Sequence, residues 1–187
     1  MAAGTDESVI DLLLHQHDEV KDLLDRLRNE RGPKQEQFNE LVRLLAVHES
    51  AEEQVVHPAA RRTEAGDEIV EERLHEENEA KRVLTELSDL GVDHPEFNAK
   101  FDKFATAVLA HAAHEENEEF PALRNSTSQE QLRRMADAVR VAEAVAPTRP
   151  HPHAGESATA NVVAGPPLSL FDRARDAVRN WAQAHRP

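Results

Sequence analysis

The 187-residue chain contains no cysteine and no tyrosine, and it has few aromatic residues and only six glycines. The absence of cysteine excludes disulfides, thiolate catalysis, iron–sulfur clusters and haem thioether attachment. The absence of tyrosine excludes a tyrosyl radical and a phenolate ligand. No stretch of about 18 residues is apolar, so we expect no membrane-spanning helix. The opening MAAGTDESV lacks the charged and then apolar region of an export signal, and a cytoplasmic protein is expected.

Acidic residues outnumber basic ones, 36 to 22, and the formal net charge is −14. A protein that binds nucleic acid needs a basic surface for the phosphates, so nucleic acid is not an expected partner. The length is sufficient for one compact domain with an appendage.

Apolar residues recur every three or four positions over the first three quarters of the chain, as in amphipathic helices. Segments containing glycine or proline separate these patterns. Four long helices are predicted, at roughly 6–30, 35–58, 67–90 and 94–119, and a shorter fifth follows Thr127 or Ser128. Because short connections favour antiparallel neighbours, we predict an all-α fold, an up-down-up-down four-helix bundle.

The chain contains an internal repeat. Phe38–Ala59 aligns with Phe101–Ala122 at an offset of 63 residues. A weaker match places His15–Leu27 over His75–Leu87. The identical residues in the stronger match include the pairs His48/His111, Glu52/Glu115, Glu53/Glu116 and Pro58/Pro121. The bundle is therefore predicted to consist of two helical hairpins related by a pseudo-twofold axis.

Two His-x-x-x-Glu pairs of this repeat fall on apolar helix faces. At about 100° per residue, His48 and Glu52 lie within ~40° of the apolar residues that precede them, and so do His111 and Glu115. A buried carboxylate is costly unless it pairs with a cation or binds a metal. We expect no inward-facing lysine or arginine beside these pairs, which favours a metal.

The first and third helices are expected to contribute to the same site. His17 lies near the centre of the first apolar face, and Glu77 occupies the matching position of the third helix. His15 and His75 point outward by the same count, although His75 would replace Glu77 if the helix ended or kinked early. The candidate metal ligands are three histidines and three glutamates: His17, His48, Glu52, Glu77, His111 and Glu115.

This mixture of imidazole and carboxylate suits iron or manganese in a four-helix bundle. Six ligands are too many for one ion with an open position, but they suit two ions bridged by Glu52 and Glu115 and by an oxo or hydroxo group. Zinc usually takes four ligands. Calcium and magnesium do not favour this much imidazole.

The segments HESAEEQVVHPA and HAAHEENEEFPAL resemble the second- and fourth-helix motifs of hemerythrin-like (HHE cation-binding) domains, and LLLHQHDEVKDLL resembles their first helix. The resemblance covers about residues 6–124 and implies a non-haem di-iron centre. Oxygen-carrying hemerythrins have H-x-x-x-H on the third helix and a longer spacing on the fourth. This chain has HEENE instead, and resembles actinobacterial hemerythrin-like proteins and the iron-sensing domain of a eukaryotic F-box protein. The resemblance implies reactions with peroxide, oxygen or nitric oxide rather than reversible oxygen carriage.

Three further residues are candidates for roles near the metals. Glu118 is predicted one turn beyond Glu115 on the inward face, as a proton relay or as a solvated glutamate near a helix end. His57 is a second relay candidate, which would cap the site, bind iron or lie on the surface before Pro58. His114 is expected beside the ligands or at an interface.

The tail is predicted to be a separate part of the chain. Residues 1–145 form the bundle with its fifth helix, 146–167 a linker rich in proline, alanine and glycine, and 168–187 an amphipathic helix. Its apolar stripe is expected to dock on the bundle or on a second subunit as a homodimer, ahead of binding to a membrane surface or another protein. The stripe consists of Phe171, Ala174, Val178 and Trp181. His151 and His153 in the linker are weak metal candidates.

Two functions follow from the ligand set and the tail. The first is a di-iron enzyme that decomposes hydrogen peroxide or uses it in peroxidase-like turnover with nitric oxide, in oxidative or nitrosative defence. The second is a protein that senses or stores oxygen, nitric oxide or iron, with the tail helix transmitting the state of the centre. A bundle that holds no metal is the third alternative.

Overall fold

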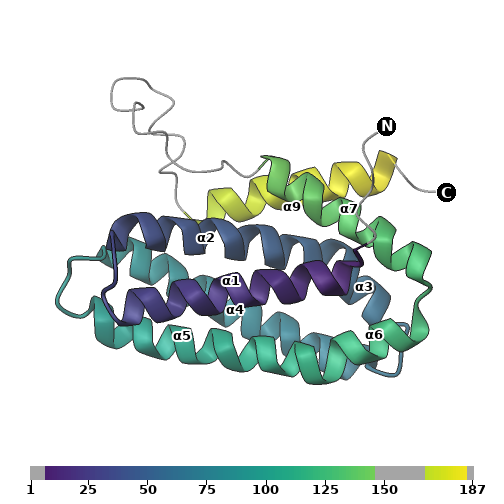
Figure 1. Ribbon diagram of the computed structural model, residues 1–187, viewed down its shortest axis with the longest axis horizontal. Coiled ribbons are helices and arrows are strands. Elements are labelled where there is room, and N and C mark those ends of the chain that lie inside the picture. The colour runs from purple at the N-terminus through teal and green to yellow at the C-terminus, as the bar shows by residue number, and fades with distance from the viewer. Residues whose placement is uncertain (1–6, 146–166, 185–187) are drawn as a thin grey trace.

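The computed structural model describes residues 7–145 and 167–184, and within these ranges every regular element is a helix. Four long helical segments lie antiparallel in a bundle, and α7 and α9 lie together along one side of it (Figure 1). The elements are α1 (Val9–Arg28), α2 (Lys34–Ala51), η1 (Glu52–Val56), α3 (His57–Ala60), α4 (Gly66–Leu90), α5 (Phe97–His114), η2 (Glu115–Glu119), α6 (Phe120–Ser126), α7 (Gln129–Val145) and α9 (Pro167–Ala184). The predicted all-α bundle is confirmed. None of the described helices is both long enough and apolar enough to cross a membrane.

Local signals set the ends of the long helices. Ser8 caps α1: its hydroxyl accepts from the backbone N–H of Asp11, and the Asp11 carboxylate accepts from the backbone N–H of Ser8. The helix therefore begins at Val9 rather than at residue 6. Helix α4 ends at Gly91, whose φ of 81° lies in a region that residues with a side chain rarely adopt.

The second and fourth segments each contain one turn that is wider than an α-helical turn. In η1 the backbone N–H of His57 donates to the carbonyl of Glu52, and in η2 the N–H of Phe120 donates to the carbonyl of Glu115. These bonds span five residues instead of four, as in a π-helix. The two wide turns are 63 residues apart, which is the offset of the sequence repeat.

A proline follows each wide turn, and the helix continues past it. In an α-helix a proline lacks one hydrogen-bond donor, and its ring clashes with the carbonyl four residues earlier. Pro121 instead lies in the first turn of α6, where no intrahelical donor is needed. The predicted end of the fourth helix at residue 119 is therefore wrong, because helical structure continues to Ser126.

The apolar core has two parts, one toward each end of the bundle. One includes Leu24, Leu84 and Phe101, and the other includes Leu13 and Phe120. Polar residues interrupt the core between them: on α1 the buried His17 separates Leu13 of one part from Val20 of the other. The candidate site lies at this interruption.

Helix α9 packs on the bundle of its own chain, which was one of the two docking arrangements expected. Phe171, Ala174 and Val178 are buried, with Phe171 in one part of the core and Val178 in the other. The hydroxyl of Ser50 on α2 donates to the carbonyl of Phe171 at 3.3 Å. The side chain of Trp181 and residues 146–166 of the expected linker, with His151 and His153, lie outside the described residues.

Candidate metal centre

The six predicted ligand residues come from four antiparallel segments and meet at the centre of the bundle. All six are buried or nearly so, and the most exposed, His111, has a side chain that is 13% exposed. They form two groups, within each of which the ligand atoms lie within 4.8 Å of one another. The first group is His17, His48, Glu52 and Glu115, and the second group is Glu52, Glu77, His111 and Glu115. Glu52 and Glu115 belong to both.

In the first group, two imidazole rings present the same nitrogen to one point. His17 Nε2 lies 3.1 Å from His48 Nε2. It also lies 3.2 Å from Glu115 Oε2, and His48 Nε2 lies 3.3 Å from Glu52 Oε2. Four possible ligand atoms therefore surround one small volume.

In the second group, one imidazole meets carboxylates. His111 Nε2 lies 3.2 Å from Glu115 Oε1. Glu77 Oε1 accepts from His57 Nε2 at 2.5 Å, and Glu77 Oε2 lies 3.4 Å from the ammonium of Lys81. This group therefore carries more negative charge than the first, with cationic partners close to it.

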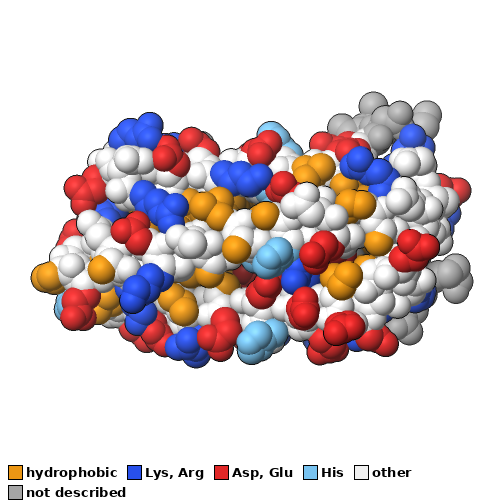
Figure 2. All heavy atoms as spheres, turned by 90° about the horizontal axis from the view of Figure 1, so that it is seen from below, with side chains coloured by type: hydrophobic (Ala, Val, Ile, Leu, Met, Phe, Trp, Pro, Cys, Tyr) orange, Lys and Arg blue, Asp and Glu red, His pale blue; other side chains and the backbone are white. Residues whose placement is uncertain are grey.

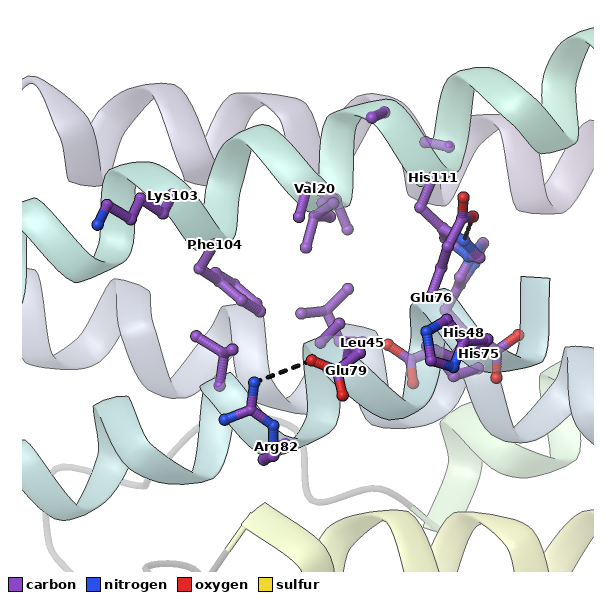
Figure 3. A pocket seen from close by; sticks show the side chains of 18 of the residues that line it. Val20, Leu45, His48, His75, Glu76, Glu79, Arg82, Lys103, Phe104 and His111 are labelled. Carbon is purple, nitrogen blue, oxygen red and sulfur yellow. Dashed lines mark hydrogen bonds and ion pairs between the residues drawn. The ribbon is translucent and has the colours of Figure 1, made fainter. Parts of the chain in front are cut away.

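A hydrogen bond on the opposite nitrogen orients each of the three imidazoles. In every case Nδ1 faces an oxygen that can only accept, so Nδ1 carries the hydrogen and a neutral ring keeps the lone pair of Nε2 for a metal. The acceptors are Glu116 at 2.8 Å for His17, Gln16 at 2.9 Å for His48 and Glu76 at 2.9 Å for His111. Figure 3 shows His111 beside Glu76. None of these three contacts was predicted from the sequence, although Glu116 is one of the residues matched in the repeat.

The shared carboxylates lack hydrogen-bond donors, although an imidazole nitrogen lies 3.2 or 3.3 Å from three of their four oxygens. Both oxygens of Glu52 and of Glu115 are buried and accept no hydrogen bond from any residue that the structure describes. Burial, and then the neighbouring Glu115 and Glu77, raise the pKa of Glu52 well above its usual value. Buried acceptors left in this state are costly. A cation between the two groups would remove that cost, so the donor set fits a metal.

The pKa values of His48 and His111 shift in opposite directions. Burial opposes the charged form of His111, but Glu115 and the hydrogen bond to Glu76 outweigh it and raise the pKa of His111 well above its usual value. Burial, and then the adjacent His17, hold the pKa of His48 well below its usual value, so the ring is neutral and able to bind a metal. Burial opposes the ionised form of Glu115, but contacts with His111 and His17 outweigh it and hold the pKa of this carboxyl well below its usual range. The three imidazoles and three carboxylates suit iron or manganese.

The inward orientation predicted for Glu118 is wrong. The Glu118 side chain is 46% exposed and pairs with Arg73 at 3.3 Å, whereas Glu119 is fully buried. The prediction assumed 3.6 residues per turn, but the wide turn η2 delays the rotation by one residue. Pro121, which an uninterrupted α-helix would not accommodate, is the one sequence signal of this change.

His57 is buried, so the surface location considered for it is wrong. Its Nδ1 lies 2.8 Å from Glu119 Oε1, and its Nε2 contacts Glu77. Burial opposes the charged ring, but the hydrogen bonds that it donates to Glu119 and Glu77 outweigh burial and raise the pKa of His57 to about 10. The structure also groups His57, Glu115 and Glu119 at metal-binding distances.

Two further histidines lie outside the centre. His75 is exposed, so Glu77 rather than His75 faces the interior. The His114 side chain is 46% exposed, and its Nδ1 lies 2.9 Å from Glu76, which also bonds His111. His114 therefore lies beside the predicted ligands, as expected.

The expectation of no inward-facing cation is wrong for the second group. Lys81 is buried, and its ammonium contacts Glu49 at 3.2 Å as well as Glu53 and Glu77. Arg175 of α9 also pairs with Glu53, at 3.0 Å. Lys81 is one helical turn after Glu77, and this spacing is the signal that could have identified it.

Comparisons with known proteins agree with the fold and the cluster. The hemerythrin HHE cation-binding domain family matches residues 8–123. A DNA nickase of Nostoc sp. is 30% identical over 140 residues, which are 74% of this chain and 40% of the nickase. An uncharacterized hemerythrin-like protein of Schizosaccharomyces pombe is 28% identical over 145 residues, 76% of this chain and 71% of that protein.

A solved structure shares the fold. The crystal structure of a hemerythrin HHE cation-binding domain-containing protein from Mycobacterium kansasii superposes with a TM-score of 0.63 at 19% identity, covering 93% of this chain and 98% of that one. The family match covers more than half of the chain and contains all six residues of the cluster. The chain belongs to the hemerythrin HHE cation-binding domain family.

Proposed function

We propose that the cluster holds two iron ions and that the chain reacts with hydrogen peroxide in a catalase- or peroxidase-like manner. The observation that supports two ions is the division of the cluster into two groups that share Glu52 and Glu115, whose four oxygens lack a hydrogen-bond partner among the described residues. When bound, iron supplies the electron transfer that peroxide, oxygen or nitric oxide requires.

The protein residues would hold the metals and set their surroundings. His17, His48 and His111 offer Nε2 in the correct tautomer, because each Nδ1 is already bonded. Glu52 and Glu115 would bridge the ions, and Glu77 would complete the second group. Carboxylate-rich ligation of this kind stabilises the ferric state, which favours peroxide chemistry over oxygen carriage.

His57 is the residue we propose for proton handling. Both of its nitrogens face carboxylate oxygens, which can only accept, so the ring satisfies both contacts only when it carries two hydrogens. It therefore holds a proton at Nε2 beside Glu77, with Glu119 behind it. Exposed Glu118 has no such contact and is not proposed for this role.

Sensing without turnover is the alternative function, and one chain of contacts favours it. Arg175 of α9 pairs with Glu53, Glu53 contacts Lys81, and Lys81 contacts Glu77 of the second group. A change in the charge of the centre would reach the C-terminal helix through these three contacts. The ligands would be oxygen, nitric oxide or iron itself.

Strand nicking, the activity in the name of the Nostoc relative, is not proposed for this chain. The match spans 40% of the nickase, and the net charge of −14 opposes binding to DNA.

The test compares the intact protein with Glu52→Ala, both purified from iron-supplemented cells. We expect two irons per chain in the intact protein, a visible spectrum that responds to peroxide, and many turnovers that Glu52→Ala abolishes. Glu68→Ala, an exposed change on α4 outside the cluster and the cavity, is the control and should behave as the intact protein does. A zinc-only protein, or turnover retained in Glu52→Ala, would contradict the proposal. Iron without turnover, together with altered hydrogen exchange of α9 on metal removal, would establish the sensor instead.

A further inference from the structure

A cavity of about 530 Å³ lies between α4 and α5 and reaches the metal centre (Figure 3). Its inner end is formed by His17, His48, Glu77 and His111. Most of its remaining wall is apolar, with contributions from all four long segments. These wall residues are Val20, Leu45, Ala80, Val83, Phe104 and Val108.

The cavity is much larger than the small molecules named above require. Oxygen, nitric oxide or peroxide needs roughly the room of one water molecule, about 30 Å³. Pockets that bind organic ligands have volumes of about 300–1,000 Å³ and mostly apolar walls. The 530 Å³ cavity falls in that range, so its size and lining fit an organic molecule.

The cavity is elongated along the seam between the two helices. It is lined from His75 to Glu86 on α4 and from Lys100 to Ala112 on α5, a length of about 16 Å at 1.5 Å per residue. The helices are antiparallel, so the ion pair Lys100–Glu86 marks the outer end and the contact of His111 with Glu76 marks the inner one. This elongated cavity, called the slot from here on, has a shape that fits a linear molecule. Each carbon–carbon bond of about 1.5 Å advances an extended, zigzag chain by about 1.25 Å, so a chain of about twelve carbons spans about 14 Å and fits within this length.

The outer end of the slot carries an available cation. Arg82 pairs with Glu79 and Glu86, and Lys100 also pairs with Glu86. Lys103 is exposed and makes no ion pair or hydrogen bond with any other residue in the described part of the chain. Figure 3 shows Lys103 and His111 at opposite ends of the slot, with Phe104 and Val20 between them.

The surface around the slot, like its wall, combines apolar and charged side chains. Figure 2 views the molecule from the side of α4 and α5 and shows apolar side chains exposed among acidic and basic ones. An apolar chain would lie along the apolar wall, while a charged head group would remain in water near Lys103. An anionic head is the one that this ammonium attracts.

We propose that the slot binds a straight-chain fatty acid of about ten to twelve carbons, with its carboxylate at Lys103 and its methyl end toward the His/Glu cluster. This names a ligand class for the cavity beside the proposed centre, and it rests on the proposed function only in assigning metals to the inner end. Binding itself depends on the slot.

The experiment is calorimetric titration of the full-length, metal-loaded protein with dodecanoate, held below its aggregation concentration. We expect one dodecanoate per chain. Ala107→Trp narrows the slot from α5 and should weaken binding at least about tenfold, whereas Ala99→Trp, exposed on the same helix outside the slot, should not. If circular dichroism shows that Ala107→Trp fails to fold, Ala80→Trp narrows the slot from α4 instead.

The head group and orientation have their own controls. Lys103→Glu should weaken dodecanoate binding about tenfold, whereas Arg134→Glu, the same change of charge at an exposed position of α7, should leave it unchanged. Dodecyltrimethylammonium, with the same tail and opposite charge, should bind more weakly than dodecanoate. Equal binding of the two, or binding unchanged in Lys103→Glu, would overturn the carboxylate assignment. Absence of dodecanoate binding would overturn the proposal that the slot binds a fatty acid. Binding that is unchanged in the Ala107→Trp or Ala80→Trp variant would overturn it as well.

Metal analysis of the same samples separates this inference from the proposed function. If iron-loaded protein does not bind dodecanoate, the proposed fatty-acid binding is refuted and the di-iron centre is not. Protein that binds dodecanoate but contains no iron would refute the di-iron centre while supporting the slot.

Discussion

The two groups of the centre are copies of one pattern that differ in charge. Both contain a His-x-x-x-Glu pair from the repeat, but the first group adds His17 and the second adds Glu77. Glu77 contacts the cations Lys81 and His57, so its charge is balanced by the protein itself. The shared Glu52 has no such partner among the described residues. The comparison teaches that the shared carboxylates, rather than the third residue of either group, create the need for a metal.

The largest expected effect is from Glu52→Gln, which removes a residue that both groups share. We expect the iron content to fall from two per chain to near zero, because each ion loses a ligand. Chelation should lower the melting temperature of the intact protein, since a metal that binds only the folded state stabilises it, and should not affect the variant. Metal analysis and thermal unfolding test this, with the exposed Glu68→Gln on α4 as the control. If Glu52→Gln retained one iron per chain, Glu52 would not be a ligand that both groups share.

His17→Ala and Glu77→Ala test the division into two groups. Each should reduce the iron content from two to one per chain, because His17 belongs to the first group alone and Glu77 to the second alone. Metal analysis after dialysis is the measurement. If either variant loses both ions, the groups form one cooperative unit and the comparison fails.

Lys81→Met tests the charge balance of the second group. The change leaves Glu49, Glu53 and Glu77 without their common cation, and removing one partner of a buried ion pair costs about 3–5 kcal/mol. We expect the free energy of unfolding by urea to fall by this amount in metal-free protein. Lys103→Met, at an exposed lysine without an ion pair among the described residues, serves as the control for stability. A loss below 1 kcal/mol would mean that the three carboxyls are already neutral.

The smallest expected effects concern the residues that orient the imidazoles, one in each group. Gln16→Ala frees Nδ1 of His48, and Glu76→Gln weakens the bond to Nδ1 of His111. Loss of such a partner lowers metal affinity about 10–100-fold. Competition with a chelator of known affinity measures this, and Asn78→Ala, exposed on α4, is the control. An unchanged affinity in both variants would show that packing alone orients the rings.

Helical periodicity and the repeat predicted the bundle. They also predicted that six residues far apart in the sequence lie close together in the fold. The inward orientation of His17 and Glu77 was predicted from the position of the apolar helix face and from the match between the two hairpins. The ends of helices were less accurate because they depend on local bonds, such as the cap at Ser8.

The surroundings of the cluster were harder to predict. Glu119 is the last residue of η2 and His57 directly follows η1. A uniform count of 3.6 residues per turn therefore places Glu118, rather than Glu119, on the inward face. Gln16 and Glu116 are contacts between helices, and a single sequence does not give the rotation of one helix against another. Lys81 could have been predicted, because residues four apart on a helix lie on the same face and Lys81 is four residues after Glu77. No inward-facing lysine or arginine was expected there.

The wide turns have a consequence for insertions and deletions. Each turn is one residue longer than the α-helical turn that it replaces, so the residues after it are displaced in phase. Deleting Asn117 would remove the extra residue, so a regular α-helix would leave Phe120 and Leu123 on nearly the same side as now. Pro121 would then lie inside that helix, where its ring clashes with the carbonyl four residues earlier. If all the residues were kept in a helix of standard pitch, the buried Phe120 and Leu123 would instead rotate by about 100°, toward solvent. The extra residue of the turn and the proline that follows it therefore depend on each other, and a deletion is tolerated only together with a replacement of the proline.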